Sequence, residues 1–258
     1  MNKNELIKYL DEYLKLSDFV DNSKNWLQID CSKDEINKIW YTVDATTYIF
    51  EKAKQENVDM VLSHHGIFWW NEEVLVWIPY KRVKMMIEND ICSYAAHLPL
   101  DAHPEVGNNI WLAKAFINIF WLRESEYSIE PFWEYKWMMI WYWIRFERPI
   151  HISNLLTSYA EQMQLIKRLY NFWKKDYINS IAFVSGWAWW EYIQAYEKWY
   201  DLYVTWESNH WNLTWAKELW QSILLWWHYE TEKIWPKLLA YHLRDKFWIE
   251  IVYLDEKY

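Results

Sequence analysis

The sequence predicts an α/β protein of two βα-repeating lobes, with mixed or parallel sheets covered by helices. Short apolar runs alternate with helical stretches along most of the chain, and this alternation is typical of sheets whose strands are connected by helices. A polar, acidic stretch at residues 123–134, which contains Pro131, separates two such series. The 258 residues suffice for two modest lobes or one large domain. We therefore expect lobes at residues 1–123 and 124–258, either separate or joined in one compact unit.

The elements follow from the spacing of apolar residues. Leu6, Leu10, Tyr13 and Leu14 recur at helical spacing and predict a first helix at residues 5–15. Short runs rich in β-branched and aromatic residues predict the strands, and longer amphipathic stretches predict the helices. The expected strands are residues 36–43, 58–63, 91–96, 138–145, 180–185, 202–205, 222–225 and 249–253. The further expected helices are residues 46–56, 79–88, 109–118, 152–163, 191–197, 213–219 and 229–244.

Composition and charge exclude several classes of protein. The net charge is −9 and the mean hydropathy −0.36, and no apolar run approaches the roughly 18 residues of a membrane span. The polar, acidic start lacks the pattern of a secretory signal, so we expect a cytoplasmic protein. An acidic chain without a basic stripe argues against nucleic acid as the main partner. Two cysteines, Cys31 and Cys92, are too few for a disulfide framework.

The content of glycine and tryptophan is anomalous. Glycine occurs 3 times and tryptophan 24 times, whereas about 18 glycines are expected at the usual ~7%. Tryptophan repeatedly occupies positions where turns favour glycine, as at Trp26, Trp187, Trp189, Trp190 and Trp227. A bulky residue in such a turn costs on the order of 1–3 kcal/mol. We interpret most of these tryptophans, Trp69 excepted, as positions of glycine in the natural chain. A UGA codon decoded with the wrong table, or a deliberate substitution scan, would produce this pattern.

Histidines and carboxylates gather after the expected strands. His64 and His65 directly follow the strand at residues 58–63, and neighbouring side chains at a strand end point in different directions. They either bind one or two metal ions or lie as a surface pair in a turn. His97 and Asp101 follow the strand at residues 91–96. Asp101 is either an oxygen ligand or a turn or N-cap residue.

A third group opens the last long helix. His228 and Glu232 are four residues apart and therefore share a helical face. The alternative is a solvated first turn, where glutamate is favoured by the helix dipole. Because open α/β sheets bind ligands at the carboxyl ends of their strands, we expect all three groups to meet there, between the lobes. Together they suit a two-metal centre with a bridging carboxylate, which can activate water for hydrolysis.

Four motifs carry a resemblance to a known family. They are NWLQI at residues 25–29, SHHGIFW at 63–69, AHLPLD at 96–101 and HYETE at 228–232. They resemble the NGLQ, SHHxxFW, AHxxLD and GHYxTE motifs of the NGG-interacting-factor-three-like dinuclear metal family, whose bacterial members are labelled GTP cyclohydrolase 1 type 2 homologs. The likeness covers almost the whole chain. The departures are tryptophans where the family has glycine, at Trp26, Trp70, Trp187, Trp189, Trp190, Trp206 and Trp227.

The resemblance implies a ligand set and an assembly. His64 and Asp101 would bind one metal ion, His65 and His228 the other, and Glu232 would bridge the two. His97 matches a family position near the metals, which we expect to support the ligands without binding. The implied cofactors are two divalent ions per subunit, from zinc, iron, manganese or nickel. The family also implies a homohexamer.

Two functions remain open at this point. The first is a metal-dependent hydrolase of a small molecule or nucleotide, in which two cations lower the pKa of a bound water toward about 7. The purine ring opening of GTP comes from the family label alone. The second is a metal-binding or metal-handling interaction scaffold without dedicated turnover, because no Walker-type loop or Ser/His/Asp triad is recognisable. The sequence does not choose the metal or the substrate.

Overall fold

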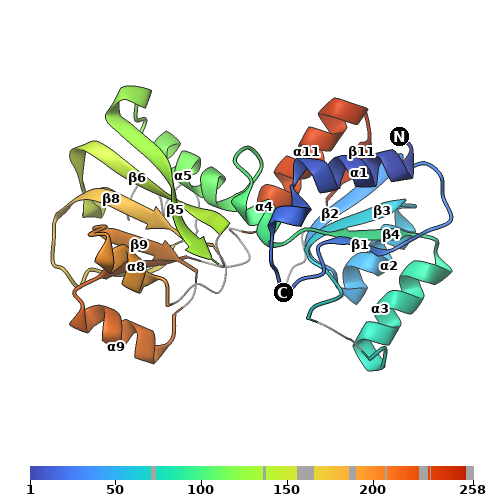
Figure 1. Ribbon diagram of the computed structural model, residues 1–258, viewed down its shortest axis with the longest axis horizontal. Coiled ribbons are helices and arrows are strands. Elements are labelled where there is room, and N and C mark those ends of the chain that lie inside the picture. Colours follow the sequence, from blue (N-terminus) through green and yellow to red (C-terminus); the bar gives the residue numbers. More distant parts are fainter. Residues whose placement is uncertain are drawn as a thin grey trace. The chain divides into compact units, whose positions relative to one another are not determined.

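The computed structural model divides the chain into two units (Figure 1). It describes residues 1–70, 74–135, 138–155, 166–185, 190–206, 208–226, 232 and 234–253. One unit consists of Met1–Val106 with Glu232–Tyr258, and the other of Gly107–Thr231. This division differs from the expected one at residue 123. The end of the chain returns to the first unit because its last helix packs on the first sheet and its last strand pairs there.

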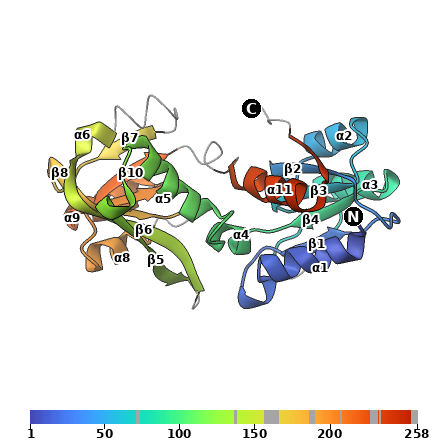
Figure 2. The same cartoon turned by 90° about the horizontal axis from the view of Figure 1, so that it is seen from above.

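The first unit is a five-stranded sheet with helices on both faces. The strand order is β1-β4-β3-β2-β11, and all pairs are parallel except β1 with β4. Helices α1 and α11 lie on one face and α2 and α3 on the other (Figures 1 and 2). The strands are β1 (Trp26–Ile29), β2 (Lys38–Asp44), β3 (Met60–His65), β4 (Cys92–Ala95) and β11 (Glu250–Val252). The helices are α1 (Lys3–Tyr13), η1 (Leu16–Asp18), α2 (Thr47–Gln55), α3 (Trp77–Glu88), α4 (Leu98–Ala102) and α11 (Ile234–Phe247).

Alternation along β2 explains the two layers of this core. Trp40 faces α2 and joins a buried cluster with Ile49 and Phe50. Its neighbour Tyr41 points to the opposite face, where its ring contacts Tyr241 of α11. Parallel strands buried on both faces read as nearly continuous apolar runs, and β2 and β3 do. Their carboxyl ends, at Asp44 and His65, lie side by side in register.

The second unit contains a six-stranded mixed sheet of order β5-β6-β8-β9-β10-β7. Strands β8, β9 and β10 are parallel, and the other pairs are antiparallel. The strands are β5 (Tyr127–Tyr135), β6 (Met138–His151), β7 (Ile166–Tyr170), β8 (Tyr177–Phe183), β9 (Leu202–Thr205) and β10 (Ser222–Trp226). The helices are α5 (Asn108–Ile119), η2 (Glu124–Glu126), α6 (Ile152–Asn154), α8 (Tyr192–Glu197) and α9 (His210–Glu218). Two sheets covered by helices confirm the expected α/β class.

The expected junction at residues 123–134 is wrong. These residues form η2 and most of β5, which pairs with β6 from Tyr127 to Tyr135. The junction was predicted partly from Pro131, because proline usually interrupts strands. It is tolerated here because β5 is an edge strand, where a residue can lack one amide donor without breaking a second ladder. Of the helix expected at residues 152–163, only α6 lies in the described part.

Tryptophan occupies backbone conformations that favour glycine. In the described parts of the chain, eleven residues other than glycine have positive φ, and seven of these are tryptophan. Four of the seven follow the ends of α5, α8, α9 and α11, which is where helices commonly place a left-handed glycine. They are Trp121, Trp199, Trp220 and Trp248, with φ from 52° to 62°. The geometry therefore supports reading these positions as glycine sites.

The two cysteines are joined. Cys31, just after β1, forms a disulfide with Cys92, the first residue of β4. The bond links neighbouring antiparallel strands across 61 residues of sequence.

The sequence also predicted that no segment spans a membrane. Among the described helices, none combines the length and apolar character needed to cross a bilayer.

Candidate metal centre

Three histidines meet at the carboxyl ends of β3 and β4. His64 and His65 close β3, and His97 follows β4. Their rings lie close together, with centroids 4.6 Å apart for His64 and His65 and 5.0 Å apart for His64 and His97. One nitrogen of each lies within 4.8 Å of the others, close enough for a shared metal site. The sequence predicted the pair at residues 64–65 as candidates, but gave His97 only a supporting place.

Two buried carboxylates approach these histidines. The Nε2 atom of His64 lies 3.8 Å from Oδ2 of Asp101 and 3.9 Å from Oε1 of Glu232. The same Oε1 atom of Glu232 lies 3.7 Å from Nε2 of His65. Two ligands of one tetrahedral ion, each about 2.1 Å from it, are separated by about 3.4 Å. The observed separations exceed this by only a few tenths of an ångström. Glu232 is therefore placed as a carboxylate shared between the two histidines.

The outer ring nitrogens of all three histidines have acceptors nearby. Nδ1 of His64 lies 3.0 Å from the carbonyl oxygen of Ala96, and Nδ1 of His65 lies 2.8 Å from Oδ1 of Asp44. Nδ1 of His97 lies 3.0 Å from Oδ2 of Asp21. An acceptor at Nδ1 fixes the proton there and leaves Nε2 as the metal-binding atom, a pattern found around most histidine ligands.

Local charges perturb the pKa of two groups. Burial alone would lower the pKa of His65, but the carboxylates of Glu232 and Asp44 outweigh it and raise the pKa to about 9. Burial alone would raise the pKa of Asp21, but hydrogen bonds and charge from His97 lower it to about 2. In the metal-free chain His65 is therefore a cation at neutral pH. A metal ion must displace that proton from the ring before it can bind Nε2.

The NWLQI motif supports the centre from β1. The side-chain oxygen of Asn25 accepts the backbone amide of His97 at 2.7 Å. The side-chain oxygen of Gln28 accepts the amides of Ile67 and Phe68, at 2.6 and 3.2 Å. These contacts hold the loops that carry the histidines. Sequence reasoning matched the motif to a family without assigning these roles, because the acceptors and donors are far apart in the chain.

Gly66 lies in the most restricted part of this loop. A Cβ atom there would lie 2.5 Å from Cβ of Ala95 and would also collide with the amide group of Gln28. Glycine is thus required at this position by a close approach of neighbouring groups.

We expect Gly66→Ala to destabilise the first unit. Overpacking of this kind typically costs about 1–3 kcal/mol, because β4 or the Gln28 side chain must move. The displaced loop also carries His65, so we expect metal content to fall with stability. Thermal unfolding and elemental analysis of the variant measure both. Unchanged values for both would contradict the close approach.

The structure brings together most of the predicted ligands. His64, His65, Asp101 and Glu232 all lie in the first unit, with relative exposures of 1%, 2% and 2% for His64, Asp101 and Glu232. Glu232 belongs to this unit although it lies near the other end of the sequence, because residues 232–258 return to the first unit. His228 lies outside the described residues.

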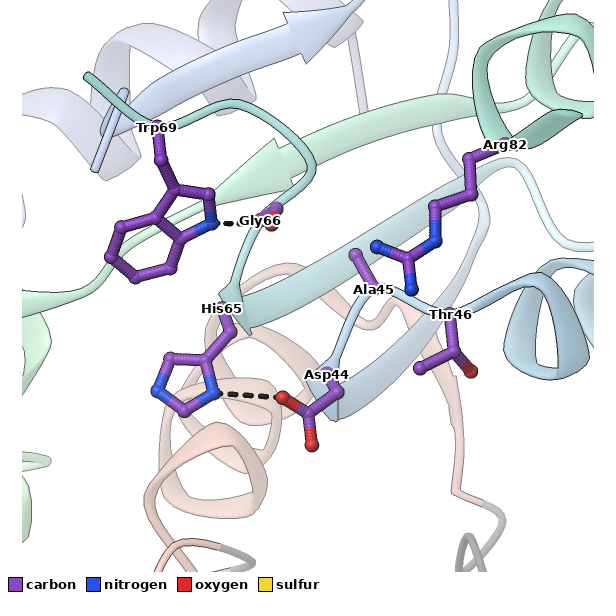
Figure 3. Close-up of a pocket in the computed structure, with 7 residues that line it drawn as sticks. All are labelled: Asp44, Ala45, Thr46, His65, Gly66, Trp69 and Arg82. Atoms are coloured by element: carbon purple, nitrogen blue, oxygen red, sulfur yellow. Dashed lines mark hydrogen bonds and ion pairs between the residues drawn. The ribbon is translucent and has the colours of Figure 1, made fainter. Parts of the chain in front are cut away.

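A cavity of about 440 Å³ opens beside His65 (Figure 3). Its lining includes Asp44 at the end of β2, Thr46 at the start of α2, Trp69 and Arg82. Figure 3 shows the guanidinium of Arg82 extending from α3 toward Ala45 and Thr46. The indole nitrogen of Trp69 donates a hydrogen bond to the carbonyl oxygen of Gly66 at 3.0 Å. A small molecule in this cavity would touch His65.

Fold and site together define an α/β protein with clustered histidines and carboxylates at the carboxyl ends of parallel strands. The profile of the Duf34/NIF3 (NGG1p interacting factor 3) family matches residues 1–257. The chain belongs to this family. The resemblance that the four motifs carry is thereby confirmed over nearly the full length.

Relatives and solved structures agree with that membership. A Pyrococcus abyssi protein named GTP cyclohydrolase 1 type 2 homolog is 36% identical over 99% of this chain and 98% of its own. A Chlamydia muridarum protein of the same name is 35% identical, with the same coverage. The crystal structure of TTHA1606 from Thermus thermophilus is 31% identical, with a TM-score of 0.82 over 100% of this chain and 99% of that one. Reduced HcgD from Methanocaldococcus jannaschii, at 22% identity and a TM-score of 0.79, shares the fold over 99% and 98% of the two chains.

Proposed function

We propose that the chain binds two divalent metal ions and is a metal-dependent hydrolase. His64 and Asp101 would hold one ion, His65 and His228 the other, and Glu232 would bridge them. The observation that carries this proposal is the position of one oxygen of Glu232, 3.9 Å from Nε2 of His64 and 3.7 Å from Nε2 of His65. Mixed imidazole and carboxylate ligands suit zinc, iron, manganese or nickel.

The ions would lower the pKa of a bound water so that it can attack an electrophilic carbon or phosphorus. The chain's own residues would orient that chemistry. Asp44 holds the His65 ring through Nδ1 at 2.8 Å, and Asp21 holds His97 at 3.0 Å. With Nδ1 of His97 held by Asp21, its Nε2 atom is the ring nitrogen that would take or give a proton.

The cavity beside His65 favours turnover over metal storage. A storage site needs only ligands, whereas a hydrolase needs space for a substrate next to them. The alternative, a metal-handling scaffold, is separated by screening the metal-loaded protein against nucleotides, cyclic phosphates and small amides. GTP belongs in this screen because the relatives are named GTP cyclohydrolase 1 type 2 homologs. Tight metal retention with no turnover would favour the scaffold.

The metal count is the direct test. We expect elemental analysis of protein purified without chelators to find about two divalent ions per chain, as a bridging carboxylate between two sites requires. One ion or none would reject the dinuclear centre. By family resemblance we also propose a homohexamer, which light scattering of the same sample measures.

A further inference from the structure

Arg82 is the notable cation of the cavity beside His65. It belongs to α3 and lies next to Lys81 and near Lys84 in sequence. Lys81 is exposed, and Lys84 approaches Glu88 at 3.6 Å on the outer side of the helix. Arg82 is instead partly buried and lines the cavity. Within the described residues, its Nε atom is buried and has no hydrogen-bond partner.

A buried donor without an acceptor is costly for a protein. Leaving such a group unpaired typically costs about 1–3 kcal/mol, and more for a charged group. A guanidinium also presents several donors in a planar fork that matches the oxygens of phosphate and carboxylate. An anionic ligand in the cavity would pair with the part of the guanidinium that lines it, for which the described residues supply no acceptor.

The start of α2 strengthens this preference for an anion. Thr46, the N-cap residue of α2, lines the same cavity, and its side-chain oxygen accepts the amide of Ile49 at 3.3 Å. Thr46 therefore places the N-terminal, positive end of the α2 dipole at this wall of the cavity, where it favours negative charge.

The carboxylate of the lining, Asp44, is engaged with the His65 ring. Its Oδ1 atom accepts a hydrogen bond from Nδ1 of His65 at 2.8 Å, so the cation Arg82 is the group of this lining that can pair with an anionic ligand. A ligand held by Arg82 would reach the His65 side of the proposed metal centre, because both residues line one cavity. The indole of Trp69 forms a further, apolar part of the lining.

We propose that Arg82, at the wall where α2 begins, binds an oxyanion group of the substrate and thereby holds its reacting bond at the metal centre. The shared chemistry is that of a phosphate ester or a carboxylate. This inference rests on the proposed hydrolase function for the reacting bond, but the anion subsite itself needs only the residues of the cavity.

The test is the binding of inorganic phosphate, and of acetate in a parallel arm, to metal-free and metal-loaded protein by calorimetry. We expect Arg82→Gln to weaken phosphate binding about tenfold or more in both forms, since it removes a charge-assisted donor pair. Arg82→Lys should restore part of the affinity through charge alone. The matched control Lys81→Gln, on the exposed side of α3, should bind as the parent does. A stronger effect with acetate than with phosphate would assign the subsite to carboxylates.

The outcomes separate this inference from the proposed function. Equal phosphate affinity of Arg82→Gln and parent overturns the subsite, whatever the metal content. A parent that contains no metal but whose phosphate binding depends on Arg82 overturns the dinuclear centre and leaves the subsite standing. Circular dichroism and elemental analysis of each variant show whether fold and metal content are retained. If Arg82→Gln does not fold, Arg82→Lys becomes the test. This variant keeps the charge but loses the planar pair of donors, so it should bind phosphate more weakly than the parent, and equal binding overturns the subsite.

Discussion

Replacement of Glu232 by glutamine should empty both metal positions. The substitution keeps the size of the side chain but removes its charge and one strong donor oxygen. Because Oε1 lies 3.9 Å from Nε2 of His64 and 3.7 Å from Nε2 of His65, its loss acts on both sites. We expect the metal content to fall from about two ions per chain to well below one, since even outer-sphere partners change affinity by about 10–100-fold.

The comparison with His65→Ala decides whether Glu232 bridges. His65 is proposed to serve one ion, so its removal should leave about one ion per chain. Glu51→Gln is the matched control, because Glu51 is an exposed carboxylate of α2 in the same unit. Elemental analysis of the three variants against the parent gives the result. Retention of about two ions by Glu232→Gln would reject the bridging role.

The sequence located the candidate ligands because they follow apolar strands directly. Parallel strands bring their carboxyl ends to one edge, so His64, His65 and Asp101 could be expected to meet. Glu232 was expected to join them because its group follows the strand at residues 222–225, but that strand lies in the other unit, and Glu232 reaches the site with the end of the chain instead. This return depends on the packing of α11 against β2 and β3, which lie roughly 170 to 210 residues earlier in the chain. Periodicity does not reveal a contact between segments so far apart.

The supporting residues were harder to predict. Asp44 lies against Nδ1 of His65, and both carboxylate oxygens of Asp21 lie against Nδ1 of His97. Asp44 falls in a familiar place of the family resemblance without an assigned role, and periodicity does not distinguish Asp21 from a surface acid. Arg82 sits in a basic stretch of α3 that reads as a solvated helix face. Its place in the cavity wall is visible only in the folded structure, where it lies with Asp44, the last residue of β2. Local pattern thus predicts strands and their ends, while partners across the fold require the packed structure.

The same distinction holds for the sheets. The expected strand at residues 202–205 matches β9, a short apolar run buried throughout. Strand β5 was missed because its polar residues and Pro131 fit an edge position that local composition does not distinguish from a loop. Strand β1 was recognised as a motif but not as a strand, because it is only four residues long, Trp26–Ile29, and just one of them is buried.

Replacing three tryptophans of the second unit by glycine should raise its stability. Trp121, Trp199 and Trp220 follow helix ends with φ of 52°, 62° and 62°. A left-handed conformation costs an L-residue roughly 1–2 kcal/mol, and glycine avoids this at the expense of about 0.5–1 kcal/mol of unfolded-state entropy. Their side chains are 87%, 72% and 57% exposed, so little buried apolar area is lost. We expect a net gain of about 1 kcal/mol per site and a melting temperature higher by roughly 10 °C for the triple variant.

Trp215→Gly tests whether the backbone conformation is the cause. Trp215 is also exposed, at 51%, but it lies inside α9 and is not among the residues of positive φ. Glycine in a helix interior is less favourable than tryptophan by about 0.5 kcal/mol, so this control should melt at a lower temperature than the parent. Trp220→Gly, at the end of the same helix, should melt at a higher one. If both single variants melted higher, the gain would come from removing exposed indoles, and the interpretation of these helix ends as glycine sites would lose its physical basis.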